Sequence, residues 1–149
     1  MPKTKQEVFW VKNLINMLRV RTKLKESKID GAGTGLFADE FIAKDSIIWE
    51  FSSNLDRTYT EDEYEKMTGL DKEFLTTYCF KFFGKYYLCV DNARFFNHSE
   101  SPNCYSSDFN ENNLGYTRAL KDILKGEELT DNYSEFSPLD EDKKFNENL

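Results

Sequence analysis

The chain has 149 residues, of which 39% are hydrophobic and 15% aromatic, and 20 Lys and Arg against 27 Asp and Glu give a formal net charge of −7. This apolar content excludes a disordered chain, and the length suggests one domain with a substantial core. The acidic balance argues against direct nucleic-acid binding, because phosphate binding needs clustered positive charge, whereas it suits a basic protein or peptide partner.

Three cysteines, Cys79, Cys89 and Cys104, form an odd set without CxxC spacing. We therefore expect neither structural zinc nor a disulfide framework, and hence a reducing, intracellular setting in the cytoplasm or nucleus. The basic start of the chain is followed by apolar positions that polar residues interrupt repeatedly. The sequence thus predicts neither a signal peptide nor a membrane span.

The first predicted element is an amphipathic helix between Glu7 and Leu18. Its apolar residues recur at helical spacing and are Val8, Val11, Leu14, Ile15 and Leu18. Such a stripe either packs on the domain or forms a dimer contact, so a monomer and a homodimer are both compatible with it.

A glycine-rich segment follows the first predicted strand. Alternating residues from Val20 to Leu24 predict a half-buried strand, and residues 31–35 (Gly-Ala-Gly-Thr-Gly) lead into apolar segments at 36–38 and 41–51. Glycines allow positive φ and a close approach of a ligand to the backbone. The spacing is not GxGxxG, and a strand rather than a helix follows, which argues against a dinucleotide site. The segment is therefore either a plain hairpin or a ligand-binding loop.

The middle of the chain predicts two short helices and a β-hairpin. Thr60 and Glu63 fit a capping box at the start of a helix that is interrupted near Gly69. A second helical piece is expected at 71–77. The hairpin is expected to consist of strands 78–83 and 86–90 with a turn at Gly84–Lys85.

A polar stretch, residues 94–104, lies between predicted strands and holds the only histidine, His98. Asn-His-Ser and Pro-Asn bend a chain and satisfy their own backbone, so the simplest interpretation is a well-bonded loop. Polar groups between core strands cost free energy when they lack partners, which makes a functional site the alternative. Strands at 105–107 and 114–120 and a polar tail at 137–149 complete a mainly β, α+β domain.

Three segments stand in a recognisable order: 31–38 (Gly-Ala-Gly-Thr-Gly-Leu-Phe-Ala), 94–104 (Arg-Phe-Phe-Asn-His-Ser-Glu-Ser-Pro-Asn-Cys) and 126–133 (Gly-Glu-Glu-Leu-Thr-Asp-Asn-Tyr). Together they resemble the SET domain of protein-lysine methyltransferases over roughly residues 22–136. The resemblance implies a fold of several small β-sheets. In this fold the chain near 97–104 and the C-terminal end near Tyr133 pass through one another in a pseudoknot-like arrangement.

The resemblance also suggests how the chain is divided. We expect an N-terminal amphipathic helix at 1–19, a SET methyltransferase domain at 20–136 and a polar tail or lid at 137–149. A variable helical insert is expected at about 52–77. Many relatives carry a zinc-binding cysteine cluster after the active-site tyrosine, but no cysteine follows Tyr133 here, so no metal is expected.

The resemblance implies S-adenosylmethionine as the cofactor and assigns residues to its site. The expected cofactor-binding residues are Ala32, Gly33, Thr34, Gly35, Arg94, Phe96, Asn97, His98, Tyr133 and Phe136. Tyr133 matches the active-site tyrosine, and Tyr78 matches a second tyrosine in the lysine channel, so both are expected to be catalytic. Asp131 also belongs to the channel, at a position where many relatives have Phe or Tyr and where the residue helps set the number of methyl groups added.

The implied function is that of a protein-lysine N-methyltransferase acting on a basic protein such as a histone. Because the lysine amine attacks the methyl group directly, the protein needs no nucleophile, and its main task is alignment. One alternative is a catalytically weak SET-like module that binds protein, which Asp131 and the missing cysteine cluster favour. The other is an acidic β-domain without a ligand.

Overall fold

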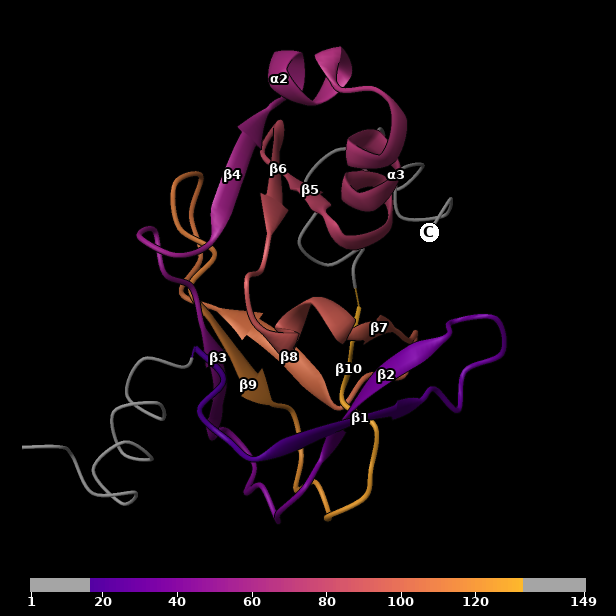
Figure 1. The fold of residues 1–149 in the computed structure, drawn as a ribbon. Coiled ribbons are helices and arrows are strands. Elements are labelled where there is room, and N and C mark those ends of the chain that lie inside the picture. The colour runs from indigo at the N-terminus through magenta and orange to yellow at the C-terminus, as the bar shows by residue number, and fades with distance from the viewer. Residues whose placement is uncertain (1–16, 133–149) are drawn as a thin grey trace, which may run out of the picture.

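The computed structural model describes residues 17–132, which fold into small β-sheets with a few short helices (Figure 1). The strands are β1 (Thr22–Glu26), β2 (Thr34–Ala38), β3 (Ile47–Glu50), β4 (Arg57–Thr60), β5 (Phe80–Phe82), β6 (Lys85–Leu88), β7 (Asn97–His98), β8 (Cys104–Ser107), β9 (Tyr116–Ala119) and β10 (Thr130–Asp131). The helices are α2 (Glu61–Lys66), α3 (Gly69–Tyr78) and the 3-10 helix η1 (Asn92–Phe95). This content confirms the predicted mainly β, α+β class.

The predicted N-terminal helix lies outside the described residues except at its end. There, Leu18 forms a β-bridge with Trp49 and is not helical, so the predicted end of the helix is wrong. The predicted tail at 137–149 also lies outside the described residues. Within residues 17–132, every helix falls short of the length and apolar character that a membrane crossing requires.

β1 and β2 form an antiparallel hairpin in which Thr22 pairs with Ala38 and Glu26 with Thr34. The predicted strand is present, but its half-burial is wrong, because Leu24 on β1 is 40% exposed. β1 pairs only with β2 in a two-stranded sheet, so its alternating pattern does not mark a face that packs on the core. β2 instead buries four of its five residues.

The main core lies around the antiparallel sheet β3–β9–β8. Its completely buried residues come from segments far apart in the sequence: Leu36, Ile48, Cys104, Ala119, Ile123 and Leu129. Ile123 and Leu129, which follow β9, therefore share one apolar cluster with β2 and β3. This packing brings residues 31–35, called the glycine turn below, close to the C-terminal part of the domain.

A second unit comprises residues 57–88 and is called the insert below, because it includes most of the insert predicted at about 52–77. It contains the sheet β4–β6–β5 with α2 and α3 beside it, and it stands at the top of Figure 1. The predicted capping box begins α2 and is confirmed, because Glu63 N–H donates to Thr60 Oγ1 at 3.1 Å and Thr60 N–H donates to Glu63 Oε2 at 2.8 Å. The insert has its own buried cluster, formed by Tyr64, Leu75, Cys79 and Tyr86.

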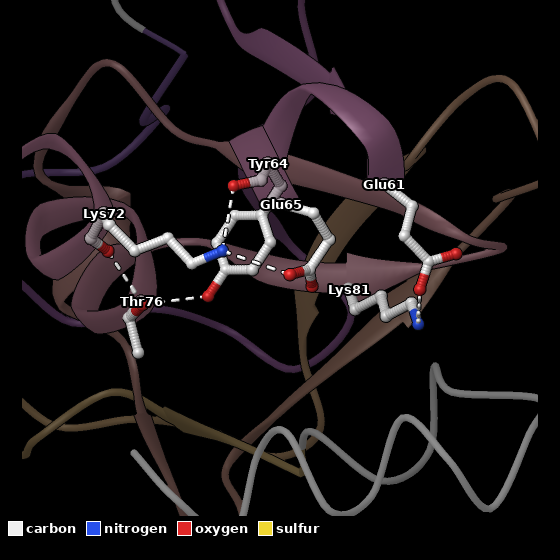
Figure 2. A network of polar contacts seen from close by, with 6 residues as sticks. All are labelled: Glu61, Tyr64, Glu65, Lys72, Thr76 and Lys81. Atoms are coloured by element: carbon white, nitrogen blue, oxygen red, sulfur yellow. Dashed lines mark hydrogen bonds and ion pairs between the residues drawn. The ribbon is translucent and has the colours of Figure 1, made fainter. Parts of the chain in front are cut away.

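Polar contacts join the two helices of the insert (Figure 2). The Lys72 ammonium donates to the Tyr64 carbonyl at 2.9 Å and lies 3.8 Å from the centre of the Tyr64 ring. The Tyr64 hydroxyl is 2.8 Å from Thr76 Oγ1, and the ring stacks on Tyr86 with centroids 3.9 Å apart. These contacts hold α3 against α2 and the sheet, because Tyr64 on α2 contacts Lys72 and Thr76 of α3 as well as Tyr86 of β6.

Two boundaries in the insert differ from the prediction. Tyr78 was expected in a strand but is the last residue of α3, and the following Cys79 N–H still donates to the Leu75 carbonyl at 2.8 Å. The hairpin turn falls at Phe83 and Gly84, with φ of 47° and 73°, rather than at Gly84–Lys85. A two-residue turn with positive φ at both positions matches the twist of its strands, which explains why the turn begins one residue earlier.

The end of the described chain threads past the polar stretch 94–104. β10 runs parallel to β7, with Thr130 opposite Asn97 and Asp131 opposite His98. The expectation that Asn97 and His98 belong to a loop is therefore wrong, because this pairing makes them a short strand. The pairing places the segment before Tyr133 beside the polar stretch, as the resemblance implied, whereas Tyr133 itself lies outside the described residues.

Asn103 fastens this threading from inside the core, where it is 7% exposed. Its Nδ2 donates to the Glu128 carbonyl at 2.8 Å, and its Oδ1 accepts the Thr130 N–H at 2.9 Å. One buried amide thus supplies both a donor and an acceptor to the backbone entering β10, which would otherwise lack partners.

Candidate functional site

Three segments meet where β2, β7 and the start of β10 come together. Leu129 N–H donates to the Leu36 carbonyl at 2.7 Å, which joins the chain before β10 to β2. Asn97 on β7 reaches across and donates from Nδ2 to the Thr34 carbonyl at 3.1 Å. The structure therefore brings together the glycine turn and Asn97, two parts of the predicted cofactor site that lie 63 residues apart.

Glu128 lies at the centre of this meeting point and was missed as a site residue by the sequence analysis. Its carboxylate accepts hydrogen bonds from the Ser27 hydroxyl at 2.8 Å, the Lys28 N–H at 2.8 Å and Asn97 Nδ2 at 3.1 Å. The only signal in the sequence is its place in the Gly-Glu-Glu-Leu segment. That signal does not point to Ser27, which is 101 residues away.

The glycines of the turn have different structural roles. Gly33 has φ of 74°, and a Cβ built there meets nothing within 4 Å, so it faces open space and is needed for its backbone conformation. A Cβ on Gly35 would instead lie 2.6 Å from Glu128 Oε2. Gly35 therefore makes room for the Glu128 carboxylate, and its predicted place in the cofactor wall stays a prediction.

A cavity of about 100 Å³ borders β10, whose residue Asp131 forms part of its wall. Four of the predicted site residues contribute to its wall, namely Tyr78, Arg94, Phe96 and Asp131. The remainder of the wall is largely apolar and includes Phe80 and Phe82. The structure thus brings the two predicted channel residues, Tyr78 and Asp131, to the wall of one cavity.

Arg94 is the first residue of the polar stretch and also lines the cavity. Its guanidinium carbon lies 5.9 Å from the centre of the Tyr78 ring and 4.8 Å from that of Phe95, and Nη1 donates to the Asp91 carbonyl at 3.3 Å. A guanidinium over aromatic rings is attracted by their π faces, so Arg94 holds the Tyr78 ring in place. Arg94 Nε is buried and has no hydrogen-bond partner among the described residues.

Two carboxylates, the buried Asp56 and the half-buried Asp91, support the backbone that leads to the site. Asp91 caps η1 by accepting the Ala93 N–H, and it also accepts the Leu18 N–H, each at 3.0 Å. Asp56 accepts N–H groups from Ser52 and Val90. Burial raises the pKa of Asp91, and it raises the pKa of Asp56 to about 6, because desolvation outweighs the hydrogen bonds that favour the charged form.

The three cysteines are free thiols buried in the structure. Burial raises the pKa of Cys79 to about 12 and also raises the pKa values of Cys89 and Cys104. Since the thiolate is the reactive form, these cysteines stay protonated near neutral pH and pack as small apolar side chains.

The remaining predicted site residues divide into two groups. His98 is exposed on β7, and Ala32 lies in the glycine turn, where its N–H donates to the Ile29 carbonyl at 3.2 Å. Tyr133 and Phe136 lie outside the described residues, so their predicted roles stay predictions. Tyr133 follows β10 by two positions in the sequence, directly after the segment that lines the cavity.

Three features define a SET domain: the small sheets, the pairing of β10 with β7, and the polar junction at which Asn97 contacts Thr34 and Glu128. A family model of the SET domain matches residues 33–134, which is more than half of the chain. The protein therefore belongs to the SET-domain family.

Two curated relatives are each 32% identical to this chain. The histone-lysine N-methyltransferase set-2 of Caenorhabditis elegans aligns over 139 residues, covering 87% of this chain and 9% of the relative. The histone-lysine N-methyltransferase trithorax of Drosophila virilis aligns over 149 residues, covering 88% of this chain and 4% of the relative. The chain thus spans less than a tenth of the length of either relative.

Solved structures share the fold. A candidate histone methyltransferase of Plasmodium falciparum has a TM-score of 0.56 at 22% identity, covering 76% of this chain and 93% of that chain. A humanized mutant of the Chaetomium thermophilum Polycomb Repressive Complex 2, bound to an inhibitor, has a TM-score of 0.60 at 25% identity, covering 80% of this chain and 16% of that chain.

Proposed function

We propose that this protein is a lysine methyltransferase that transfers a methyl group from S-adenosylmethionine to the side-chain amine of lysine in a basic protein such as a histone. The observation that carries the proposal is that two sites share the paired strands β7 and β10. Asn97 on β7 contacts the glycine turn, and Asp131 on β10 lines the cavity together with Tyr78. A group-transfer enzyme needs two neighbouring sites of this kind to align its donor and acceptor.

The polar junction fits the proposed cofactor. S-adenosylmethionine supplies a methyl group activated on a sulfonium. The open space beyond Gly33 leaves room for a ligand against the backbone, and Asn97 Oδ1 accepts no hydrogen bond from the described residues. That acceptor suits the cationic amine of the ligand. We propose that the cofactor is held by Ala32, Gly33, Thr34, Gly35, Arg94, Phe96, Asn97 and His98, with Tyr133 and Phe136 completing the site.

The cavity would hold the substrate lysine. A free lysine amine has a pKa of about 10.4, so it must lose a proton before it can attack. An apolar cavity favours the neutral amine, because the ammonium form is poorly solvated there. The Tyr78 and Tyr133 hydroxyls would orient the amine. The Asp131 carboxylate acts in the opposite sense, since a nearby anion favours the ammonium form and attracts a cationic side chain.

A catalytically weak SET-like protein-binding module is the second candidate. The observation that favours it is Asp131, which is 5% exposed in the cavity wall at a position where the resemblance implies an aromatic residue. An anion that holds lysine as ammonium would retain a substrate better than it would methylate one.

The test uses S-adenosylmethionine labelled on its methyl group, incubated with core histones and with a cell lysate, with Tyr133→Phe as the matched variant. The proposed function predicts label in protein that resists base, as an N-methyl bond does, and falls by about 100-fold or more in the variant. Cofactor binding without transfer would instead establish the binding module. Absence of both would rule out both candidates.

A further inference from the structure

We propose that Glu128 is a positioning residue for cofactor binding: it sets the orientation of the Asn97 amide and so makes this site selective for the amine of the ligand. The inference rests on the proposed function, because S-adenosylmethionine is the ligand that brings the amine. It goes further in assigning a role to a glutamate that lies outside the predicted cofactor site.

The first step is the fixed direction of the Asn97 amide. Its Nδ2 lies 3.1 Å from the Thr34 carbonyl oxygen and 3.1 Å from Glu128 Oε2. A carbonyl and a carboxylate are acceptors only, so both contacts require the amide nitrogen. With the amide turned over, Oδ1 would face two acceptor oxygens, and both hydrogen bonds would be replaced by repulsion. The network around Asn97 therefore determines its orientation.

The second step is that Glu128 cannot turn away from Asn97. Its carboxylate is held from the other side by the Ser27 hydroxyl and the Lys28 N–H. The bond between Asn103 Nδ2 and the Glu128 carbonyl holds the backbone at the same residue. Because side chain and backbone are both bonded, the negative end of Glu128 stays directed at the Asn97 amide.

The third step concerns the ligand. With both amide hydrogens used, Asn97 presents only its Oδ1, which accepts no hydrogen bond from the described residues. An ammonium group is a donor with no acceptor and carries the charge that a site beside a carboxylate favours. A ligand group that can only accept would find no donor on this side chain. The junction therefore selects for an amine.

Gly35 helps keep Glu128 in the position from which it orients Asn97. A Cβ at this position would lie 2.6 Å from Glu128 Oε2 and 3.0 Å from its Cδ. The carboxylate could not stay where it is, so Gly35→Ala should push it away from Asn97. The Glu128 side chain thus gives a reason for glycine at this position that does not depend on the ligand.

Glu128→Gln tests the orientation without changing the size of the side chain. In this variant the glutamine amide oxygen is the only group that can accept the Lys28 N–H. The glutamine NH2 group would then face Asn97 Nδ2, so that two hydrogen-bond donors would point at each other. The matched control is Glu127→Gln, the same change one residue away, in a side chain that accepts the Leu124 N–H and does not contact Asn97.

The experiment measures binding of S-adenosylhomocysteine and of its analogue without the α-amino group by calorimetry. Glu128→Gln should weaken binding of the amine-bearing ligand by roughly 10- to 100-fold, the range of a lost charge-assisted hydrogen bond, and leave the analogue unchanged. Glu127→Gln should behave like wild type with both ligands. Equal weakening of both ligands by Glu128→Gln, or of neither, would overturn the proposal while leaving the proposed cofactor in place. If wild type binds neither ligand, the proposed function fails and this inference fails with it.

A second measurement needs no ligand. Gly35→Ala should lower the melting temperature in the wild-type background and do so less in the Glu128→Ala background. Removal of the carboxylate relieves the two shortest contacts of the added Cβ and leaves the one with Phe37 Cε2 at 3.2 Å. An equal shift in the two backgrounds would show that Glu128 is not what requires a glycine at this position.

Discussion

The insert and the threaded site, by which we mean the region around Asn97, Asn103 and Glu128, differ in how far apart in the sequence their contacting residues lie. In the insert, residues 57–88, the helix begins at a capping box whose two members, Thr60 and Glu63, are three positions apart. In the threaded site, the bond between Ser27 and Glu128 joins residues 101 positions apart. The first kind of contact forms with its own segment, whereas the second exists only after most of the chain is ordered.

This difference implies different responses to change. A lost contact in the insert should cost about its own local free energy and leave the site intact. A lost polar group in the threaded site leaves buried partners unsatisfied on a second segment, so its cost is larger and reaches ligand binding. The following predictions test this contrast, in order of decreasing effect.

The largest effect is expected at Asn103 in the threaded site. Asn103→Leu keeps the volume but leaves the Glu128 carbonyl and the Thr130 N–H without their partner, so the free energy of unfolding should fall by about 3 kcal/mol. Urea denaturation measures it. The matched control is Asn112→Leu at an exposed position, with an expected change within about 0.5 kcal/mol. If the two variants are equally stable, the threading does not depend on this amide.

The next effect concerns Asp56, which joins the loop before β4 to the chain after β6. Burial raises its pKa from 3.8 to about 6, so the folded state favours the protonated form. The stability this group contributes is therefore complete below about pH 4 and is lost as the pH rises through about 6, by about 3 kcal/mol in total.

Asp56→Asn removes this titration. From pH 4 to pH 7, the wild type should lose stability relative to the variant, as measured by urea denaturation at several pH values. Asp91, whose pKa is also raised, remains in both proteins, and its charge is the smallest of the causes that shift the pKa of Asp56, so most of its own contribution cancels in the difference. Parallel stability profiles for the two proteins would contradict the assigned pKa.

Tyr78 connects the two regions, because it ends α3 of the insert and also lines the cavity. Tyr78→Phe keeps the ring against Phe95 and Arg94 but removes the hydroxyl proposed to orient the amine. We expect kcat/KM for a lysine peptide to fall by about tenfold, or about 1.4 kcal/mol, with unchanged melting temperature. Tyr105→Phe, whose hydroxyl donates to Asp45 away from the cavity, is the control and should keep full activity. Equal activity of both variants would remove Tyr78 from the proposed mechanism.

The smallest effect is expected at the capping box of the insert. Thr60→Ala removes the acceptor for the Glu63 N–H and should lower the free energy of unfolding by about 1 kcal/mol. Binding of S-adenosylhomocysteine should not change, because the contact is confined to the insert. A weakened ligand affinity in this variant would contradict the separation of the two regions. Thr58→Ala on the exposed side of β4 serves as the control.

The sequence alone determined the features that depend on neighbouring residues and on residue order. The capping box at Thr60 and the mainly β class follow from local pattern, and the structure confirms both. The order of the three segments around residues 31–38, 94–104 and 126–133 was sufficient to indicate the family, which the family model then established. Local backbone chemistry also explains the glycine at position 33, where φ is positive.

Only the tertiary structure decided which distant groups meet. Glu128 lies against Gly35, which nothing in the sequence indicated. Tyr78 and Asp131 line one cavity, a pairing that the family resemblance implied but that no local pattern indicates. The physical reason is that a carboxylate or a phenol has the same local pattern whether it is solvated or buried against another segment. Its partner is selected when the chain closes on itself, and that closure brings together residues about a hundred positions apart.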